Sequence, residues 1–277
     1  MNTTRPLSLL TIALFCTGFF GCASAPDLPA EARLSTYDAA PYAAVLDAAV
    51  RGGNVDYAAI ADRPDTLDDP DGRLDVYLDA VARFGPESTP ELFPTRDHEL
   101  AYYLNAYNAL MLRLWLDNGA READGDEKVS WLTWFTVNQW RVDNRTMSLD
   151  FLEQRLIRPR YQEPLIHAAL VCGAVDCPPL WHEPFDGDRL GEQLDAVMHA
   201  WLHDPAEDGL RVDDDGSVRL SAIFGWYRDD FRPTGGLPEV IRTYLDDDDP
   251  RKAVALAAFE ENRVRFMGYD WTINLAE

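Results

Sequence analysis

The architecture of this chain follows from the stretch Asp97-His-Glu-Leu-Ala-Tyr-Tyr-Leu-Asn-Ala-Tyr-Asn-Ala-Leu-Met-Leu-Arg-Leu-Trp-Leu-Asp-Asn118. Its apolar residues recur every three or four positions, which is the period of an amphipathic α-helix. Asn105 and Asn108 lie three residues apart and therefore share one face of that helix. Asparagine side chains compete for backbone hydrogen bonds, so two of them among apolar neighbours need buried partners. We expect the two amides either to orient a substrate or a catalytic histidine, or to bond to a neighbouring loop and fix its path.

Helical and strand-like patterns surround this helix in no regular order. Residues Asp150 and Glu153 form a capping-box pattern at the start of one helix. Further helices are expected after Asp38 and from Leu74, Leu190, Pro238 and Pro250. Hairpins are expected across Asp143-Asn144 and Asp215-Gly216, and strands at 165–171 and near Val264. This mixture predicts an α+β fold in a single domain, residues 36–277, with helices packed on a small, mainly antiparallel sheet.

The second informative stretch is His167-Ala-Ala-Leu-Val-Cys-Gly-Ala-Val-Asp-Cys-Pro-Pro-Leu-Trp-His182. Histidine titrates near neutral pH and cysteine is a strong nucleophile, so His167, Cys172 and Cys177 are candidate catalytic residues. The two cysteines are also an even pair, which favours a local disulfide in an exported protein. The even five-residue spacing from His167 to His182 suggests zinc, but zinc sites use tighter ligand pairs. We therefore expect no metal at this stretch and no cofactor.

The N-terminus has the features of an export signal. Residues 1–21 combine one positive charge, an apolar run and small residues, and this run is too short to span a bilayer as a stable helix. The Gly21-Cys22 junction resembles the cleavage box of bacterial lipoproteins, which predicts a lipid anchor on Cys22 and a polar tether over 22–35. Ala23 favours an envelope location at the outer membrane, facing the periplasm. The alternative is cleavage after Ala25 and a soluble periplasmic or secreted protein.

The charge of the chain restricts its partners. The formal net charge is −23, which repels phosphates and argues against nucleic acid. It also argues against binding to a membrane surface through basic residues. A solvated acidic surface explains this charge more simply than adaptation to salt.

Several segments together resemble the family called domain of unknown function 547. They follow one another along most of the chain: Val55-Asp-Tyr57, Tyr103-Leu-Asn-Ala-Tyr-Asn-Ala-Leu110, Ser148-Leu-Asp150 with Glu153, His167 to Leu180, Leu220 to Phe231, and Tyr269-Asp-Trp271. The resemblance implies no particular activity, because none is attached to the family. The pattern is also loosely similar to papain- or transglutaminase-type folds, in which a central helix packs on a small antiparallel sheet that carries a histidine.

Two functions remain open from the sequence. The favoured one is a non-catalytic binding or structural module of the envelope, with a Cys172–Cys177 disulfide and with the asparagines as buried hydrogen-bonding groups. The alternative is a thiol-dependent hydrolase or acyltransferase, with Cys172 or Cys177 as nucleophile and His167 as base. Asn105 or Asn108 would then orient the histidine or stabilise an oxyanion. Either way, we expect His167 and the two asparagines to converge at one polar site.

Overall fold

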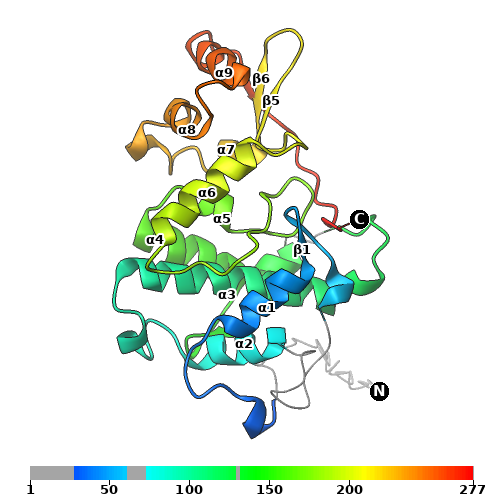
Figure 1. Cartoon of the computed structure of the whole chain (residues 1–277), viewed down its shortest axis with the longest axis vertical. Helices are drawn as coiled ribbons and strands as arrows, with labels where there is room; N and C mark the ends of the chain where they lie inside the picture. The colour runs from blue at the N-terminus through cyan, green and yellow to red at the C-terminus, as the bar shows by residue number, and fades with distance from the viewer. Residues whose placement is uncertain (1–27, 61–72, 129–131, 277) are drawn as a thin grey trace, which may run out of the picture.

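The computed structural model describes residues 28–60, 73–128 and 132–276, so the expected signal (1–21) and Cys22 lie outside the described residues. A helical body occupies one end of the molecule and a smaller lobe the other (Figure 1). The body contains α1 (Ala40–Ala49), α2 (Arg73–Arg83) and the long α3 (Arg96–Asp117), with α1 packed on α2 and α2 on α3. Among these described residues no helix is long and apolar enough to cross a membrane.

The helix predicted over residues 97–118 is confirmed and forms the centre of the core. Its N-terminus is capped by Thr95, whose Oγ1 accepts a hydrogen bond from the backbone of His98 (3.3 Å). From Leu100 to Leu112 every residue of α3 is buried, because other elements pack around it on all sides. The asparagines of this helix therefore have no access to solvent and must find protein partners.

Within the described residues the strands form three small sheets rather than one. Two of them are antiparallel hairpins: β1 (Val50–Arg51) pairs with β2 (Asn54–Val55), and β3 (Trp140–Val142) pairs with β4 (Arg145–Met147). The third sheet contains β5 (Leu210–Val212), β6 (Val218–Leu220) and β7 (Val264–Phe266), and β5 pairs with β6 in antiparallel. Strand β7 pairs with β6 in parallel. The predicted turn at Asp143-Asn144 is confirmed, with φ of 51° and 58°, as a tight hairpin requires.

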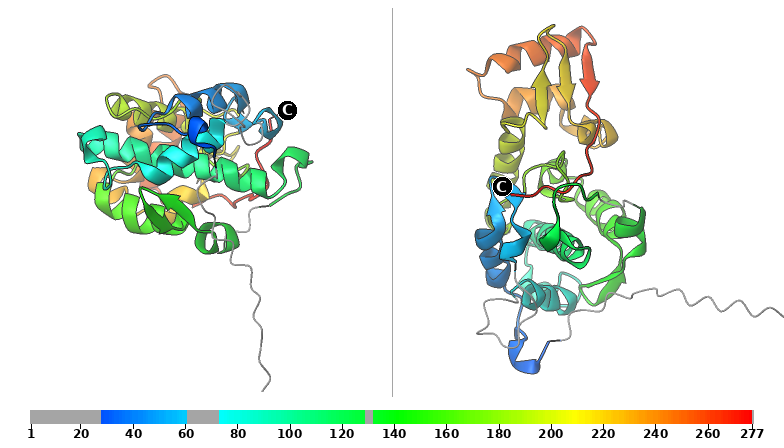
Figure 2. Two further views of the ribbon diagram at one scale, coloured as in Figure 1. Left: turned by 90° about the horizontal axis from the view of Figure 1, so that it is seen from below. Right: turned by 90° about the vertical axis from the view of Figure 1, so that its right-hand side faces the viewer.

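The α+β class is confirmed, but the expected packing of helices on one sheet is not seen in the described residues, where helices pack mainly around α3. The smaller lobe holds the three-stranded sheet with α8 (Leu237–Tyr244) and α9 (Pro250–Glu260), and α6 (Leu190–Leu202) and α7 (Ala222–Trp226) lie between it and the body (Figure 1). After β7 the chain returns from this lobe to the body, where Ile273 bridges to Ala174 and Leu275 to Val55 (Figure 2).

Two local predictions are wrong. Residues 165–171 do not form a strand, because Ile166–Ala169 make a four-residue helix, α5, before the chain extends at Leu170. The π-helix Phe151–Ile157, which continues into α4 (Arg158–Tyr161), is not capped by Asp150; instead Ser148 Oγ accepts a hydrogen bond from the backbone of Phe151 (3.1 Å). Glu153 therefore does not form the expected capping box with Asp150, and its side chain lies in the site described below.

Part of the predicted tether is folded. Within residues 28–35, the side chains of Leu28 and Ala32 are buried against Val76 of α2. Arg83 donates a hydrogen bond to the carbonyl of Leu34 (2.8 Å). The described part of this segment is therefore attached to the body. A second π-helical segment lies at Leu132–Val137, and short 3-10 helices lie at Ala30–Ala32, Tyr57–Ala59, Pro90–Leu92, Ala120–Glu122 and Arg232–Thr234.

Candidate functional site

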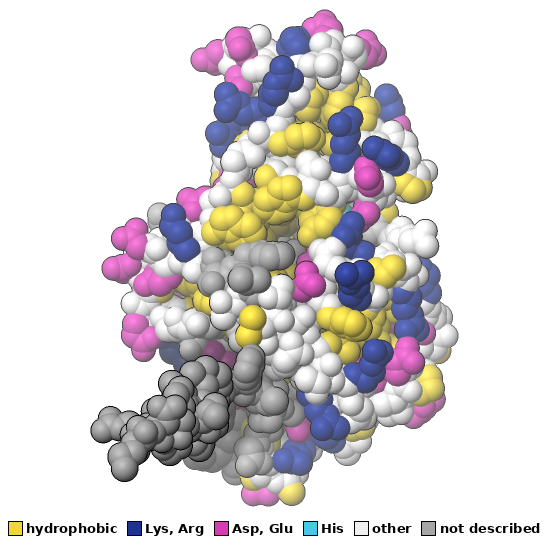
Figure 3. All heavy atoms as spheres, turned by 180° about the vertical axis from the view of Figure 1, so that it is seen from behind, with side chains coloured by type: hydrophobic (Ala, Val, Ile, Leu, Met, Phe, Trp, Pro, Cys, Tyr) yellow, Lys and Arg dark blue, Asp and Glu magenta, His cyan; other side chains and the backbone are white. Residues whose placement is uncertain are grey.

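A cavity of about 730 Å³ lies where the body meets the smaller lobe. The face opposite to that of Figure 1 shows hydrophobic side chains gathered across the middle of the molecule, with acidic and basic side chains beside them (Figure 3). The cavity is lined by His167, both cysteines, several aromatic side chains and several charged ones. The aromatic residues are Tyr107, Phe135, Trp226, Tyr227, Tyr269 and Trp271. The charged residues are Asp150, Glu153, Arg155 and Arg158. Trp226 is 52% exposed, so the cavity opens to solvent at this wall.

His167 is held by a carboxylate from a distant part of the chain. Its Nε2 lies 2.8 Å from Oδ2 of Asp230, which follows the short helix α7. Arg158 binds the same carboxylate with two hydrogen bonds, Nε to Oδ2 (2.8 Å) and Nη2 to Oδ1 (2.9 Å). The hydrogen bond with His167, together with the Arg158 guanidinium, holds the pKa of Asp230 well below its usual range against the opposing effect of burial.

This ionisation state fixes the tautomer of the histidine. An ionised carboxylate only accepts hydrogen bonds, so Nε2 carries a proton and donates it to Asp230. In the neutral ring the lone pair then lies on Nδ1. The ring also stacks on Tyr227 at 3.9 Å between centroids and 11° between planes, which fixes its orientation.

Glu153 forms the second polar group of the cavity. It accepts hydrogen bonds from the hydroxyls of Tyr227 (2.7 Å, at Oε1) and Tyr107 (3.3 Å, at Oε2), and from the side chain of Gln154 (2.8 Å). Burial and the neighbouring Glu153 carboxylate raise the pKa of Tyr227 far above its usual value, so this tyrosine remains a hydrogen-bond donor at neutral pH. The Tyr227 ring that stacks on His167 is therefore held in place by the hydrogen bond between its hydroxyl and Glu153.

Cys172 and Cys177 meet at the same cavity. Both are free, and their Sγ atoms lie 2.7 Å apart, beyond the bond length of about 2.05 Å that a disulfide requires. The expected disulfide is therefore not present in the structure. Cys177 Sγ accepts a hydrogen bond from the backbone of Cys172 (2.9 Å), and Tyr269 Oη lies 3.2 Å from Cys172 Sγ.

The two thiols differ in acidity. Burial raises the pKa of Cys172 well above its usual value, and the interaction with Cys177 adds to this rise. Burial also opposes ionisation of Cys177, but hydrogen bonds from the Cys172 thiol, Tyr269 and the Cys172 backbone outweigh it and lower the pKa of Cys177. Cys177 is therefore the thiol on which a negative charge is best stabilised.

The turn between the cysteines depends on glycine. Gly173 has φ of +74°, and a Cβ at this position would lie 2.3 Å from Nε1 of Trp115. The same indole nitrogen donates a hydrogen bond to the carbonyl of Cys172 (2.9 Å). The close approach of Trp115 thus positions Cys172 relative to the core.

The asparagines of α3 do not line the cavity. Asn105 exchanges two hydrogen bonds with the backbone of Phe185, both of 2.8 Å. Asn108 donates to the carbonyl of Ala169 (2.8 Å) and accepts from the backbone of Val171 (2.9 Å). Both amides therefore fix the path of a neighbouring segment, and in the described structure neither bonds to His167. Asn108 nevertheless positions the backbone that joins His167 to Cys172.

Reasoning from the sequence did not select three groups of this site. Glu153, Tyr227 and Asp230 all lie in segments that carry the family resemblance, but nothing in their spacing links them to His167. The four evenly spaced residues from His167 to His182 do not form a cluster of metal ligands among the described residues.

One comparison with protein families found a match that covers part of this site. Residues 92–202 match the family model "Protein of unknown function, DUF547". The matched range includes α3, His167, Cys172 and Cys177, whereas Tyr227, Asp230 and Tyr269 follow it. The resemblance to this family is thereby confirmed. Comparisons with curated proteins and with solved structures found no match.

Proposed function

We propose that this chain is a thiol-dependent hydrolase or acyltransferase that acts on an ester or amide. Cys177 is the nucleophile, His167 the acid–base group and Asp230 a positioning residue. The observation that carries the proposal is that two free thiols and His167, whose ring is held by Asp230, line one cavity that opens to solvent. A sealed disulfide would have favoured a structural module instead.

The reaction begins with Cys177 as thiolate. Its sulfur attacks the carbonyl carbon of the substrate, and a thioester forms as the carbon–oxygen or carbon–nitrogen bond breaks. The leaving alcohol or amine takes a proton from the protonated His167 ring. Water or a second acceptor then gives up a proton to Nδ1 and attacks the thioester, which releases the acyl group and restores the thiolate.

The walls of the cavity favour a substrate with an apolar or ring-shaped face. Trp226 and Trp271 stack at 5.9 Å between centroids and 12° between planes, and Tyr269 lies against both. Arg158 is already engaged by Asp230, so it adds little free positive charge for an anionic substrate. Aromatic side chains of this kind contribute to binding because a ligand buries apolar surface against them and stacks on their rings.

Hydrolysis of p-nitrophenyl acetate by the reduced protein tests this function. We expect turnover in the wild type, loss of turnover to background in Cys177→Ser, and retained turnover in Cys172→Ser, the matched control on the neighbouring thiol. Equal rates in all three proteins would show that no cysteine acts as the nucleophile.

A second candidate is the binding module with a Cys172–Cys177 disulfide. The short sulfur–sulfur separation favours it, because thiol–disulfide exchange with an oxidised dithiol protein needs little movement of either side chain. Alkylation of protein purified without reductant separates the two functions. Labelling of both cysteines supports the thiol enzyme, and labelling of neither supports the module.

The proposal places this activity at the bacterial cell envelope, on a lipid anchor at Cys22 that faces the periplasm. The support is the leader pattern over 1–21 and the Gly21-Cys22 junction. Expression of Cys22→Ala should release the protein from the membrane fraction or block its maturation. An unmodified N-terminus after Ala25, found by mass spectrometry, would rule out the anchor.

A further inference from the structure

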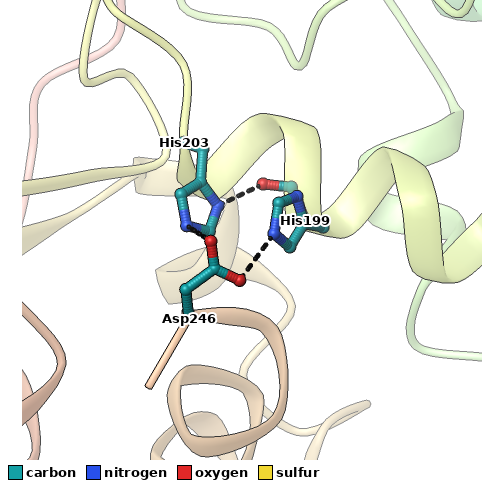
Figure 4. A group of neighbouring side chains, drawn as sticks. All are labelled: His199, His203 and Asp246. Atoms are coloured by element: carbon teal, nitrogen blue, oxygen red, sulfur yellow. Dashed lines mark hydrogen bonds and ion pairs between the residues drawn. The ribbon is translucent and has the colours of Figure 1, made fainter. Parts of the chain in front are cut away.

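A second group of candidate ligand residues lies away from the cavity, at the end of α6. His199 lies in the last turn of this helix and His203 at its C-cap, so the two rings share one face of the helix. Asp246 comes from the connection between α8 and α9 and faces both rings (Figure 4). The rings stack at 4.0 Å between centroids. Three side chains from two separate elements thus point to one spot.

The separations match those of a tetrahedral metal site. Nε2 of His199 lies 3.1 Å from Oδ1 of Asp246, and Nε2 of His203 lies 3.6 Å from Oδ2. All three ligand atoms fall within 4.8 Å of one another. Two ligands of a tetrahedral zinc ion with bonds of about 2.0–2.1 Å lie roughly 3.3 Å apart. The three atoms are therefore near enough to share one ion once the two imidazole rings, which are stacked with 19° between their planes, turn toward it.

The tautomer of His203 provides an independent argument. Its Nδ1 lies 2.8 Å from the carbonyl of His199, which only accepts, so Nδ1 carries the proton. In the neutral ring Nε2 then presents a lone pair. This atom is buried and has no hydrogen-bond partner among the described residues, although Asp246 and Asp249 carboxylates face it at 3.6 and 3.7 Å. A lone pair facing carboxylates is unfavourable unless a cation lies between them.

We propose that His199, His203 and Asp246 bind a zinc ion. Two imidazoles and one carboxylate suit zinc, whereas magnesium and calcium prefer sites made of oxygen atoms alone. The C-terminal end of α6 also favours positive charge. Asp249 is engaged by Arg251 and caps α9, so a water molecule completes the four ligands. The ion links α6 to the α8–α9 connection.

A proton is the competing cation. Doubly protonated imidazoles would form ion pairs with Asp246 without any metal. Titration of the metal-free protein with zinc chloride by calorimetry separates these cases. Because thiolates are zinc ligands, every protein in the experiment carries Cys172→Ser and Cys177→Ser, which removes both cavity thiols.

We expect one zinc ion per chain in this background, and affinity at least about tenfold weaker in His203→Ala and in Asp246→Asn. His182→Ala, which removes an exposed histidine outside the cluster, should bind zinc with unchanged affinity. Binding of cobalt(II) should give the intense visible absorption of a tetrahedral site, a readout that needs no variant at the ligands. Absence of zinc binding near neutral pH, or equal affinity in all variants, would overturn the site and leave the ion pair.

Discussion

Two sets of buried polar side chains meet at the segment between Ile166 and Phe185: Asn105 and Asn108 contact it from α3, and His167 and Cys177 belong to it. They are held in different ways. Asn105 and Asn108 each donate one hydrogen bond to a backbone carbonyl and accept one from a backbone amide. His167 instead bonds to an ionised side chain, and Cys177 to a thiol and a backbone amide. The asparagines lie away from the cavity that His167 and both cysteines line.

The difference shows what makes a buried polar group available for chemistry. A carboxamide that donates to one backbone carbonyl and accepts from one backbone amide holds that stretch of chain in place, and neither of its groups exchanges a proton near neutral pH. The imidazole retains a lone pair on Nδ1, and the Cys177 sulfur retains its nucleophilic electrons. Substitutions in the first set should therefore change stability, and those in the second should change reactivity.

The largest effect is expected from His167→Gln. Glutamine can still donate a hydrogen bond to Asp230 but cannot exchange protons near neutral pH. Turnover of p-nitrophenyl acetate should fall by about 10²–10⁴-fold, the usual contribution of a general acid–base group. The midpoint of urea unfolding should change little. A variant with wild-type turnover would remove His167 from the reaction.

A loss of stability is expected from Asn108→Ala. The substitution leaves the carbonyl of Ala169 and the amide of Val171 buried without partners. The free energy of unfolding should fall by about 2–4 kcal/mol, since each unsatisfied group costs roughly 1–3 kcal/mol. Asn105→Ala is the matched variant on the same helix and should lose a similar amount. Because Asn108 positions the segment beside Cys172, only Asn108→Ala should also slow turnover.

The pH dependence of stability gives a smaller effect with a definite sign. The pKa of Asp230 is lowered in the folded state, so its stabilising contribution is present above the unfolded pKa of about 3.9 and is lost as pH falls further. In Asp230→Asn this acid-induced loss should be reduced, as measured by urea unfolding across the acid range. An unchanged pH profile would contradict the ionised state assigned to Asp230.

Asp208 offers a control of opposite sign. Burial, with the charges of Asp176 and Asp204, raises its pKa to about 6. Its ionisation therefore destabilises the fold, and wild-type stability should fall as pH rises from about 4 to 6. Asp208→Asn should remove that fall and leave the loss below pH 4 unchanged.

Much of the secondary structure follows from local pattern. The long helix, the Asp143-Asn144 hairpin and the helix at Pro250 are each specified by spacing, turn residues or caps that lie within a few positions of one another. The segment 165–171 illustrates the limit. A short apolar run fits a buried strand and a buried helix equally well, and its path here is set by Asn108, more than fifty residues earlier.

The candidate site shows the same limit more strongly. His167, Cys172 and Cys177 were identifiable because their chemistry is distinctive and they lie close together in sequence. Asp230 was not, because its contact with His167 depends on how α7 packs beside the cavity. His199 and His203 lie four residues apart on a predicted helix, which is a spacing that metal-binding histidines use.

The most direct test of the account is to identify the residue that becomes acylated. Reduced protein is mixed with p-nitrophenyl acetate, quenched early in the reaction, digested and analysed by mass spectrometry. Lysine occurs only at Lys128 and Lys252, so background acetylation of amines is limited. We expect a transient acetyl group on Cys177, which decays in the wild type and persists in His167→Gln. Acetylation that never reaches Cys177, or that favours Cys172, would contradict it.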